Sequence, residues 1–185
     1  MMLSVRDREC LPIVQGGMGV GVSAHRLAGS VAREGGIGTL SSVDLRRHHP
    51  DLMKATAGMR ERAVIDRANL VALDREVRQA KALAGGRGLV AVNVMRAVSE
   101  YASYVKQSCA SGADAIVVGA GLAMDLPELV EEWPHVALVP IVSEARALSL
   151  ILKKWRRRNR LPDAVVVEHP RYAGGHLGAA RMEDV

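Results

Sequence analysis

Six short runs rich in valine and isoleucine recur along the chain at a nearly regular interval. Their first residues are Leu11, Ile37, Leu89, Ala115, Ala137 and Ala164. Successive runs begin 22 to 27 residues apart, except for one interval of 52, and an interval of the shorter size holds one strand and one helix. Strands that are apolar along their whole length are typical of a parallel sheet covered on both faces. The repeat therefore predicts an α/β fold with a parallel sheet.

The segments between these runs have the spacing of amphipathic helices. The interval of 52 residues holds a long helical tract, roughly Val64 to Ala84. Another segment places four apolar residues on one helical face: Val98, Ala102, Val105 and Cys109. Glycine pairs such as Gly85-Gly86 stand where a helix is expected to end. No linker is visible, so residues 1–185 are predicted to form a single domain.

Two α/β architectures fit this alternation. In a doubly wound sheet, the GxGxxA stretch from Gly19 to Ala24 would be a dinucleotide fingerprint, with Asp44 as the acid that binds ribose. In a parallel (β/α) barrel of the TIM type, every strand ends on the same face and the site collects residues from many strand ends.

The distribution of polar residues and glycines favours the barrel. Such residues follow nearly every predicted strand: Gly16 to Met18, Ser41, Ser42, Asn93, Gly119, Ser143 and His176. A doubly wound sheet concentrates its ligand at one switch point, whereas here the candidates form a ring. Glycine and asparagine are also common in turns for backbone reasons alone, so each position taken singly has a structural explanation.

Composition limits the class of protein further. The chain has no phenylalanine and only 3% aromatic residues, which predicts an aliphatic core. Cys10 and Cys109 lie far apart and outside any metal-binding spacing, so we expect no disulfide framework, no metal site and a reducing, cytoplasmic location. No apolar run approaches the length of a membrane span.

The histidines outside the C-terminal glycine cluster are assigned no chemistry. His48 and His49 precede Pro50 with no carboxylate or cysteine at ligand spacing, which favours a surface turn over a metal pair. His25 is expected to open a helix after Ser23.

The net charge of +5 is concentrated in one segment. Lys153 to Arg160, KKWRRRNR, holds six cations and no anion. It contains no aromatic residue besides Trp155 and no recognisable nucleic-acid motif, so a solvated helix end is favoured over nucleic-acid binding.

Three stretches, in this order, resemble the nitronate monooxygenase family, also called 2-nitropropane dioxygenases. They are PIVQGGMGVGVSAHRLAGSVAREGGIGTLSSVDL from Pro12, VAVNVM from Val90, and AGGHLG from Ala173. The family also contains flavin-dependent enoyl-acyl carrier protein reductases. The resemblance implies an FMN enzyme on a TIM barrel that oxidises a nitronate or nitroalkane with molecular oxygen. A homo-oligomer is a separate expectation, because an open barrel would expose strand edges that can pair with another chain.

The resemblance also implies roles for individual residues. Gly16, Gly17 and Met18 would lie under the flavin ring and offer it backbone groups, although the family usually has proline where Gly17 stands. Asn93 would hydrogen-bond the flavin or the substrate. The remaining three follow the sixth run: Gly174 and Gly175 would approach the cofactor, and His176 would be the catalytic base.

The sequence of 185 residues indicates only six of the eight βα units of a TIM barrel. We therefore expect an incomplete barrel that lacks its C-terminal units. Such barrels usually hold the flavin phosphate after strands seven and eight, so weak FMN binding is also expected. Two alternatives stay open: an NAD(P)H oxidoreductase similar to the enoyl reductases, and an inactive fragment or interaction module.

Overall fold

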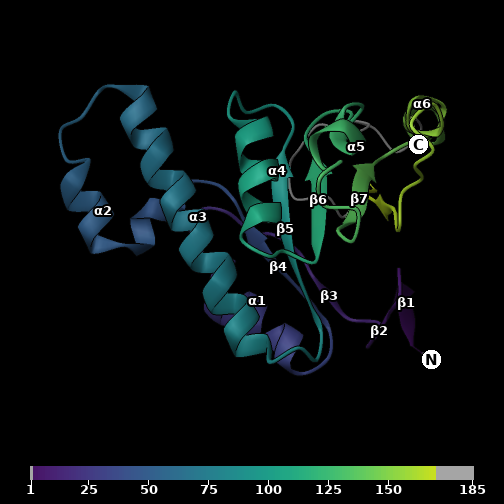
Figure 1. Cartoon of the computed structure of the whole chain (residues 1–185), viewed down its shortest axis with the longest axis horizontal. Helices are drawn as coiled ribbons and strands as arrows, with labels where there is room; N and C mark the ends of the chain where they lie inside the picture. Colours follow the sequence, from purple (N-terminus) through teal and green to yellow (C-terminus); the bar gives the residue numbers. More distant parts are fainter. Residues whose placement is uncertain (1, 170–185) are drawn as a thin grey trace.

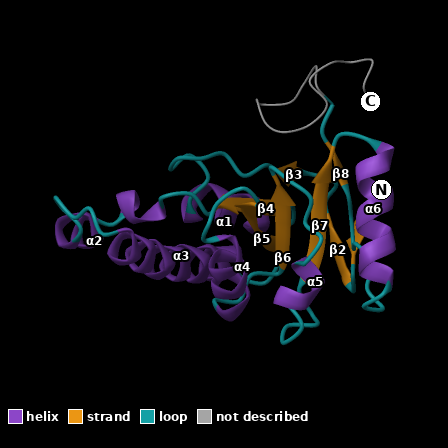
Figure 2. Ribbon diagram, turned by 90° about the horizontal axis from the view of Figure 1, so that it is seen from above, coloured by secondary structure: helices purple, strands orange, loops and turns teal. Residues whose placement is uncertain are grey.

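The six predicted strands form one parallel sheet whose strands follow one another in chain order (Figure 1). The computed structural model describes residues 2–169. The strands are β3 (Val14–Gln15), β4 (Ile37–Ser41), β5 (Leu89–Met95), β6 (Ala115–Gly119), β7 (Ala137–Val142) and β8 (Val166–Val167). Each pairs in parallel with the next, and the sheet is curled rather than flat (Figure 2).

Helices fill the intervals between these strands. They are α1 (His25–Arg33), the 3-10 helix η1 (Leu45–His48), α2 (Pro50–Ala55), α3 (Arg62–Ala84), α4 (Tyr101–Ala110), α5 (Leu126–Leu129) and α6 (Ala145–Arg156). The long tract predicted from Val64 is α3, and it ends where Gly85 adopts the left-handed conformation at φ 58°. None of the described helices is long and apolar enough to cross a membrane.

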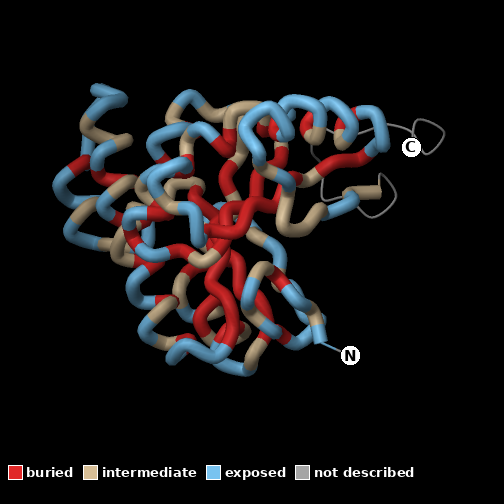
Figure 3. The backbone as a smooth tube through the Cα atoms, turned by 45° about the vertical axis from the view of Figure 1, so that its right-hand side comes forward, coloured by how far each residue is buried: buried red, intermediate tan, exposed pale blue. Residues whose placement is uncertain are grey.

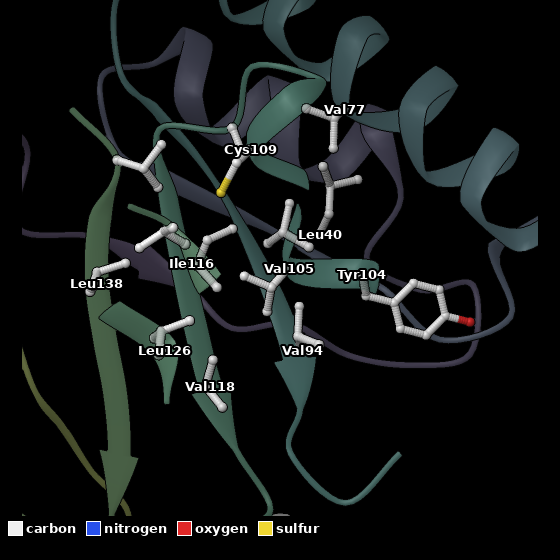
Figure 4. Close-up of a cluster of buried hydrophobic side chains, with 14 of the residues drawn as sticks. Leu40, Val77, Val94, Tyr104, Val105, Cys109, Ile116, Val118, Leu126 and Leu138 are labelled. Carbon is white, nitrogen blue, oxygen red and sulfur yellow. The ribbon is translucent and has the colours of Figure 1, made fainter. Parts of the chain in front are cut away.

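The convex face of the sheet packs against the helices. Leu40, Val94 and Ile116 point from the strands into this outer core, where they meet Val77 of α3 and Val105 of α4 (Figure 4). The predicted face of α4 is partly wrong, because Ala102 is exposed while Tyr104, two residues later, is buried. The core is mostly aliphatic, as predicted from the composition, and its aromatic members are Tyr101, Tyr104 and Trp155.

The concave face holds a second, smaller core. The sequence did not predict the antiparallel hairpin of β1 (Leu3–Val5) and β2 (Arg8–Cys10), which supplies Val5 and Cys10 to this inner core. The strands contribute the rest: Ile37, Leu89, Ala91, Ala115, Val117, Ala137 and Val139. The hairpin therefore covers inward-facing side chains at the amino ends of the strands, and the middle of the sheet is buried on both faces (Figure 3).

Strand order and helix placement exclude the doubly wound alternative. Such a sheet reverses its strand order at a switch point and carries helices on both faces. Here the order is sequential, and no described helix contributes to the inner core. Asp44, the candidate ribose acid, forms ion pairs with Arg46 and Arg47 instead. The arrangement is that of a TIM-type barrel with six of its eight units.

The surface turn predicted at His48 and His49 is wrong for His49. This residue precedes α2, its side chain is only 12% exposed, and its Nε2 lies 3.1 Å from Oε1 of Glu76, a carboxylate buried within α3. The other oxygen of Glu76, Oε2, accepts hydrogen bonds from the backbone N–H and Nδ1 of His25, at 2.7 and 2.8 Å. Helix α1 begins at His25 as predicted, and no metal-binding group occurs among the described residues.

The basic segment from Lys153 to Arg160 has structural partners. Trp155 is fully buried and donates its indole N–H to the Ala123 carbonyl, at 2.9 Å. Arg158 pairs with Glu128 at 2.8 Å, and Arg160 pairs with Asp163 at 2.6 Å. These contacts fit the predicted helix end.

Both cysteines are expected to be unreactive in the folded protein. Burial raises the pKa of the Cys109 thiol to about 12 and also raises the pKa of Cys10. At pH 8 about one Cys109 side chain in ten thousand is then the reactive thiolate. A disulfide reagent such as dithiobis(nitrobenzoate) should release almost no aromatic thiolate from the native chain and two equivalents after denaturation. Native reaction as fast as that of free cysteine would contradict this prediction.

Candidate active site

A cavity of about 500 Å³ opens at the carboxyl ends of the strands. Its lining consists of Gly17, Met18, Gly19, Val20, Ser41, Val43, Asn93, Met95, Gly119, Ala120, Ile141 and Glu168. These residues come from the ends of five strands and from the loop after β3. The carboxyl end is where TIM barrels carry their active sites, so the cavity is the candidate active site.

The pleat of the strands determines which residues face this cavity. Asn93 and Met95 are two positions apart on β5, so they share a face. Ser41 is paired with Asn93 across the β4–β5 ladder. The residues two positions earlier on these faces, such as Ala91 and Val117, belong to the inner core. The inner core therefore forms an apolar floor to the cavity, and Ser41 and Asn93 lie next to this floor.

Gly17 is packed tightly against Asn93. The Asn93 amide Nδ2 lies 3.5 Å from the Gly17 carbonyl oxygen, which is the long limit of a hydrogen bond. A methyl group at Gly17 would lie 2.5 Å from Asn93 Cβ, closer than real Cβ contacts. Glycine therefore allows the loop after β3 to lie directly over Asn93.

Five of the residues predicted at the strand ends line the cavity: Gly17, Met18, Ser41, Asn93 and Gly119. Gly16 is exposed and does not line the cavity, and Ser42 and Ser143 are buried outside its lining. Gly174, Gly175 and His176 lie outside the described residues. Sequence reasoning missed Met95 and Ile141, although the alternation of side chains along a strand would have found Met95 from Asn93.

The lining is mostly apolar and carries little charge. Glu168, which follows β8, is the one charged side chain among the lining residues that the structure describes. The neutral polar side chains are the hydroxyl of Ser41 and the amide of Asn93. A ligand here would meet hydrogen-bonding groups and aliphatic surface rather than a cationic cluster.

A family model described as nitronate monooxygenase matches residues 8–185, nearly the whole chain. The chain belongs to the nitronate monooxygenase family. The match confirms the resemblance inferred from the three stretches of sequence. No curated protein matches the chain.

Solved structures show similarity to this member of the nitronate monooxygenase family at the level of the fold. FabK from Thermotoga maritima superimposes with a TM-score of 0.55 and 18% identity, over 85% of this chain and 40% of that chain. A mutant of the same FabK gives a TM-score of 0.55 and 18% identity, over 85% of this chain and 42% of the mutant chain. Nitroalkane oxidase from Streptomyces ansochromogenes gives a TM-score of 0.36 and 16% identity, over 84% of this chain and 64% of the oxidase chain. The chain thus spans about 40% of the length of FabK.

Proposed function

We propose that this chain carries the flavin-binding end of an FMN-dependent oxidoreductase that oxidises nitronates or nitroalkanes with molecular oxygen. The observation that supports the proposal best is the cavity at the carboxyl ends of the strands, where Gly17 lies directly over Asn93. Family membership supports the same reading. The small-molecule substrate and oxygen would both reach the site through the mouth of the cavity.

The cavity fits a flavin ring in size and chemistry. Its volume of about 500 Å³ lies within the range of about 300 to 1,000 Å³ that is usual for ligand pockets. Val20, Val43, Met95 and Ile141 offer aliphatic surface to a flat ring, and the amide of Asn93 offers a hydrogen bond to its polar edge. Bound flavin would supply electron transfer from the substrate carbanion to oxygen.

The chain's own part in the reaction is binding, orientation and proton removal. A nitroalkane is a carbon acid whose anion spreads its charge onto the nitro oxygens. A neutral imidazole at His176 would remove the α-proton, and the resulting imidazolium would hydrogen-bond the anion. Asn93 would orient the ring or the substrate from the rim of the cavity.

Flavin titration of the apoprotein tests the proposal. We expect saturable binding with a dissociation constant of about 10 μM or weaker. The described lining contacts the flavin ring but contains no cationic side chain that would bind the phosphate of FMN. FMN and riboflavin should therefore bind within about threefold of each other. Fluorescence quenching measures both affinities. A chain that leaves flavin fluorescence unchanged up to saturating concentrations would refute the proposal.

A pair of variants localises this binding. Asn93→Ala removes the amide from the cavity and should weaken flavin binding about tenfold, as expected for the loss of one buried hydrogen-bonding group. Asn159→Gly changes an exposed asparagine before β8, at the other end of the strands, and should leave the affinity unchanged, because glycine readily adopts the left-handed backbone at φ 51° of this residue. Anaerobic addition of NADPH to the flavin complex separates the enoyl reductase alternative, since only that activity requires reduction of the flavin by NADPH.

A further inference from the structure

The loop after β3 is held by the side chain of one buried serine. Ser23, which lies two residues before α1, is fully buried. Its Oγ accepts hydrogen bonds from the Met18 N–H and from the Gln15 amide, both at 2.9 Å. The same hydroxyl donates to the Gly16 carbonyl at 3.2 Å. One donor and two acceptors are all that a hydroxyl provides, and Ser23 uses all three on this loop.

Backbone hydrogen bonds join the same serine to the wall of the cavity. The Ser23 N–H donates to the Met18 carbonyl at 2.9 Å, so the two residues are bonded in both directions. The Ser23 carbonyl accepts from the N–H of Ser41 at 3.0 Å. The loop is therefore connected through Ser23 to the end of β4, where Ser41 lines the cavity.

Gln15 explains why the strand ends before this loop. Its side-chain Oε1 accepts from the Thr39 N–H and its Nε2 donates to the Thr39 carbonyl, both at 3.1 Å. The side-chain amide thus occupies the positions that the next backbone groups of β3 would take in the ladder with β4. As a result, the N–H of Gly17 has no acceptor among residues 2–169.

We propose that Ser23 is a positioning residue that holds the loop from Gly16 to Met18 in the conformation that receives the flavin ring. Glycine-rich backbone has many accessible conformations, and ordering it only on binding would reduce the affinity. Ser23 orders the loop beforehand. Its Oγ also binds the Met18 N–H, whereas the N–H groups of Gly16 and Gly17, which have no acceptor among residues 2–169, stay available to the ligand. This inference rests on the proposed function, because it needs a flavin in the cavity.

Amide exchange and flavin titration together test this role. In the apoprotein, Ser23→Ala should accelerate exchange of the Met18 N–H at least tenfold, while the N–H of Val92 in the buried middle of β5 keeps its rate. The same variant should weaken flavin binding at least tenfold. Ser30→Ala in α1 is the matched control and should change neither quantity. Ser23→Cys keeps the size of the side chain with a weaker hydrogen-bonding group, and it is the second variant if Ser23→Ala does not fold.

Each outcome decides a separate question. Unchanged Met18 exchange in Ser23→Ala overturns the inference, and so does faster exchange with unaltered flavin affinity. Equal acceleration at Met18 and Val92 indicates a general loss of stability and also overturns it. If the unsubstituted chain binds no flavin, the proposed function fails, and the exchange rates alone decide whether Ser23 orders the loop.

Discussion

Gly38→Ala is expected to lower the free energy of unfolding by at least about 3 kcal/mol. Gly38 lies in β4 beneath α1, and a Cβ atom there would stand 1.8 Å from the Ala28 carbonyl oxygen and 2.5 Å from its carbon. Both are backbone atoms, so no side-chain rotation relieves the overlap. Helix α1 would have to move away from the sheet and expose the fully buried Ala28 and Ala32. Urea denaturation of both proteins measures the difference.

Gly16→Ala is the control for this substitution. A Cβ atom at Gly16 has no neighbour within 4 Å, so the stability should change by no more than about 0.5 kcal/mol. The two substitutions add the same methyl group and differ in the space around it. Equal stability of the two variants would contradict the close packing of α1 on β4. The displacement of α1 should also disturb Ser23, since this residue directly precedes the cap of the helix.

The order of the strands in the sheet could be predicted because it follows from the regular spacing of the apolar runs. Regular intervals leave room for one helix between neighbouring parallel strands, and β4, β5, β6 and β7 begin at the residues predicted from their apolar runs. The two edge strands are shorter than their runs. In β3 the side chain of Gln15 ends the ladder, which hydrophobicity cannot indicate.

Features that depend on contacts distant in sequence could not be predicted. The two strands of the β1–β2 hairpin have only three residues each, too few to show a pattern, and packing against the inner core explains the burial of Val5 and Cys10. The sequence around His49 predicts a surface turn because its partner, Glu76, is distant in the sequence and lies on α3. Helix α4 buries the face that carries Tyr101 and Tyr104, and this orientation leaves Ala102 exposed.

The candidate site was predictable in its location and less so in its details. Gly17, Met18 and Asn93 were predicted from the resemblance, and the structure brings all three to one cavity. The role of Ser23 could not be predicted, because it depends on the conformation of the loop. In the sequence, a serine before a helix indicates only a turn. Strand alternation separates Ser41, which faces the cavity, from Ser42, which does not.

His176→Asn should lower kcat/KM for neutral nitroalkanes at least about a hundredfold in the flavin-loaded protein, as expected for the loss of a general base. Asparagine keeps polarity and approximate size but cannot accept the α-proton. Preformed nitronates have already lost this proton, so their oxidation should be largely retained, and flavin affinity should not change. Oxygen consumption with each substrate form measures both rates. His135→Asn alters an exposed loop histidine as the matched control. Equal losses on nitroalkanes and nitronates would assign His176 to substrate binding, and unchanged rates on both would remove it from the reaction.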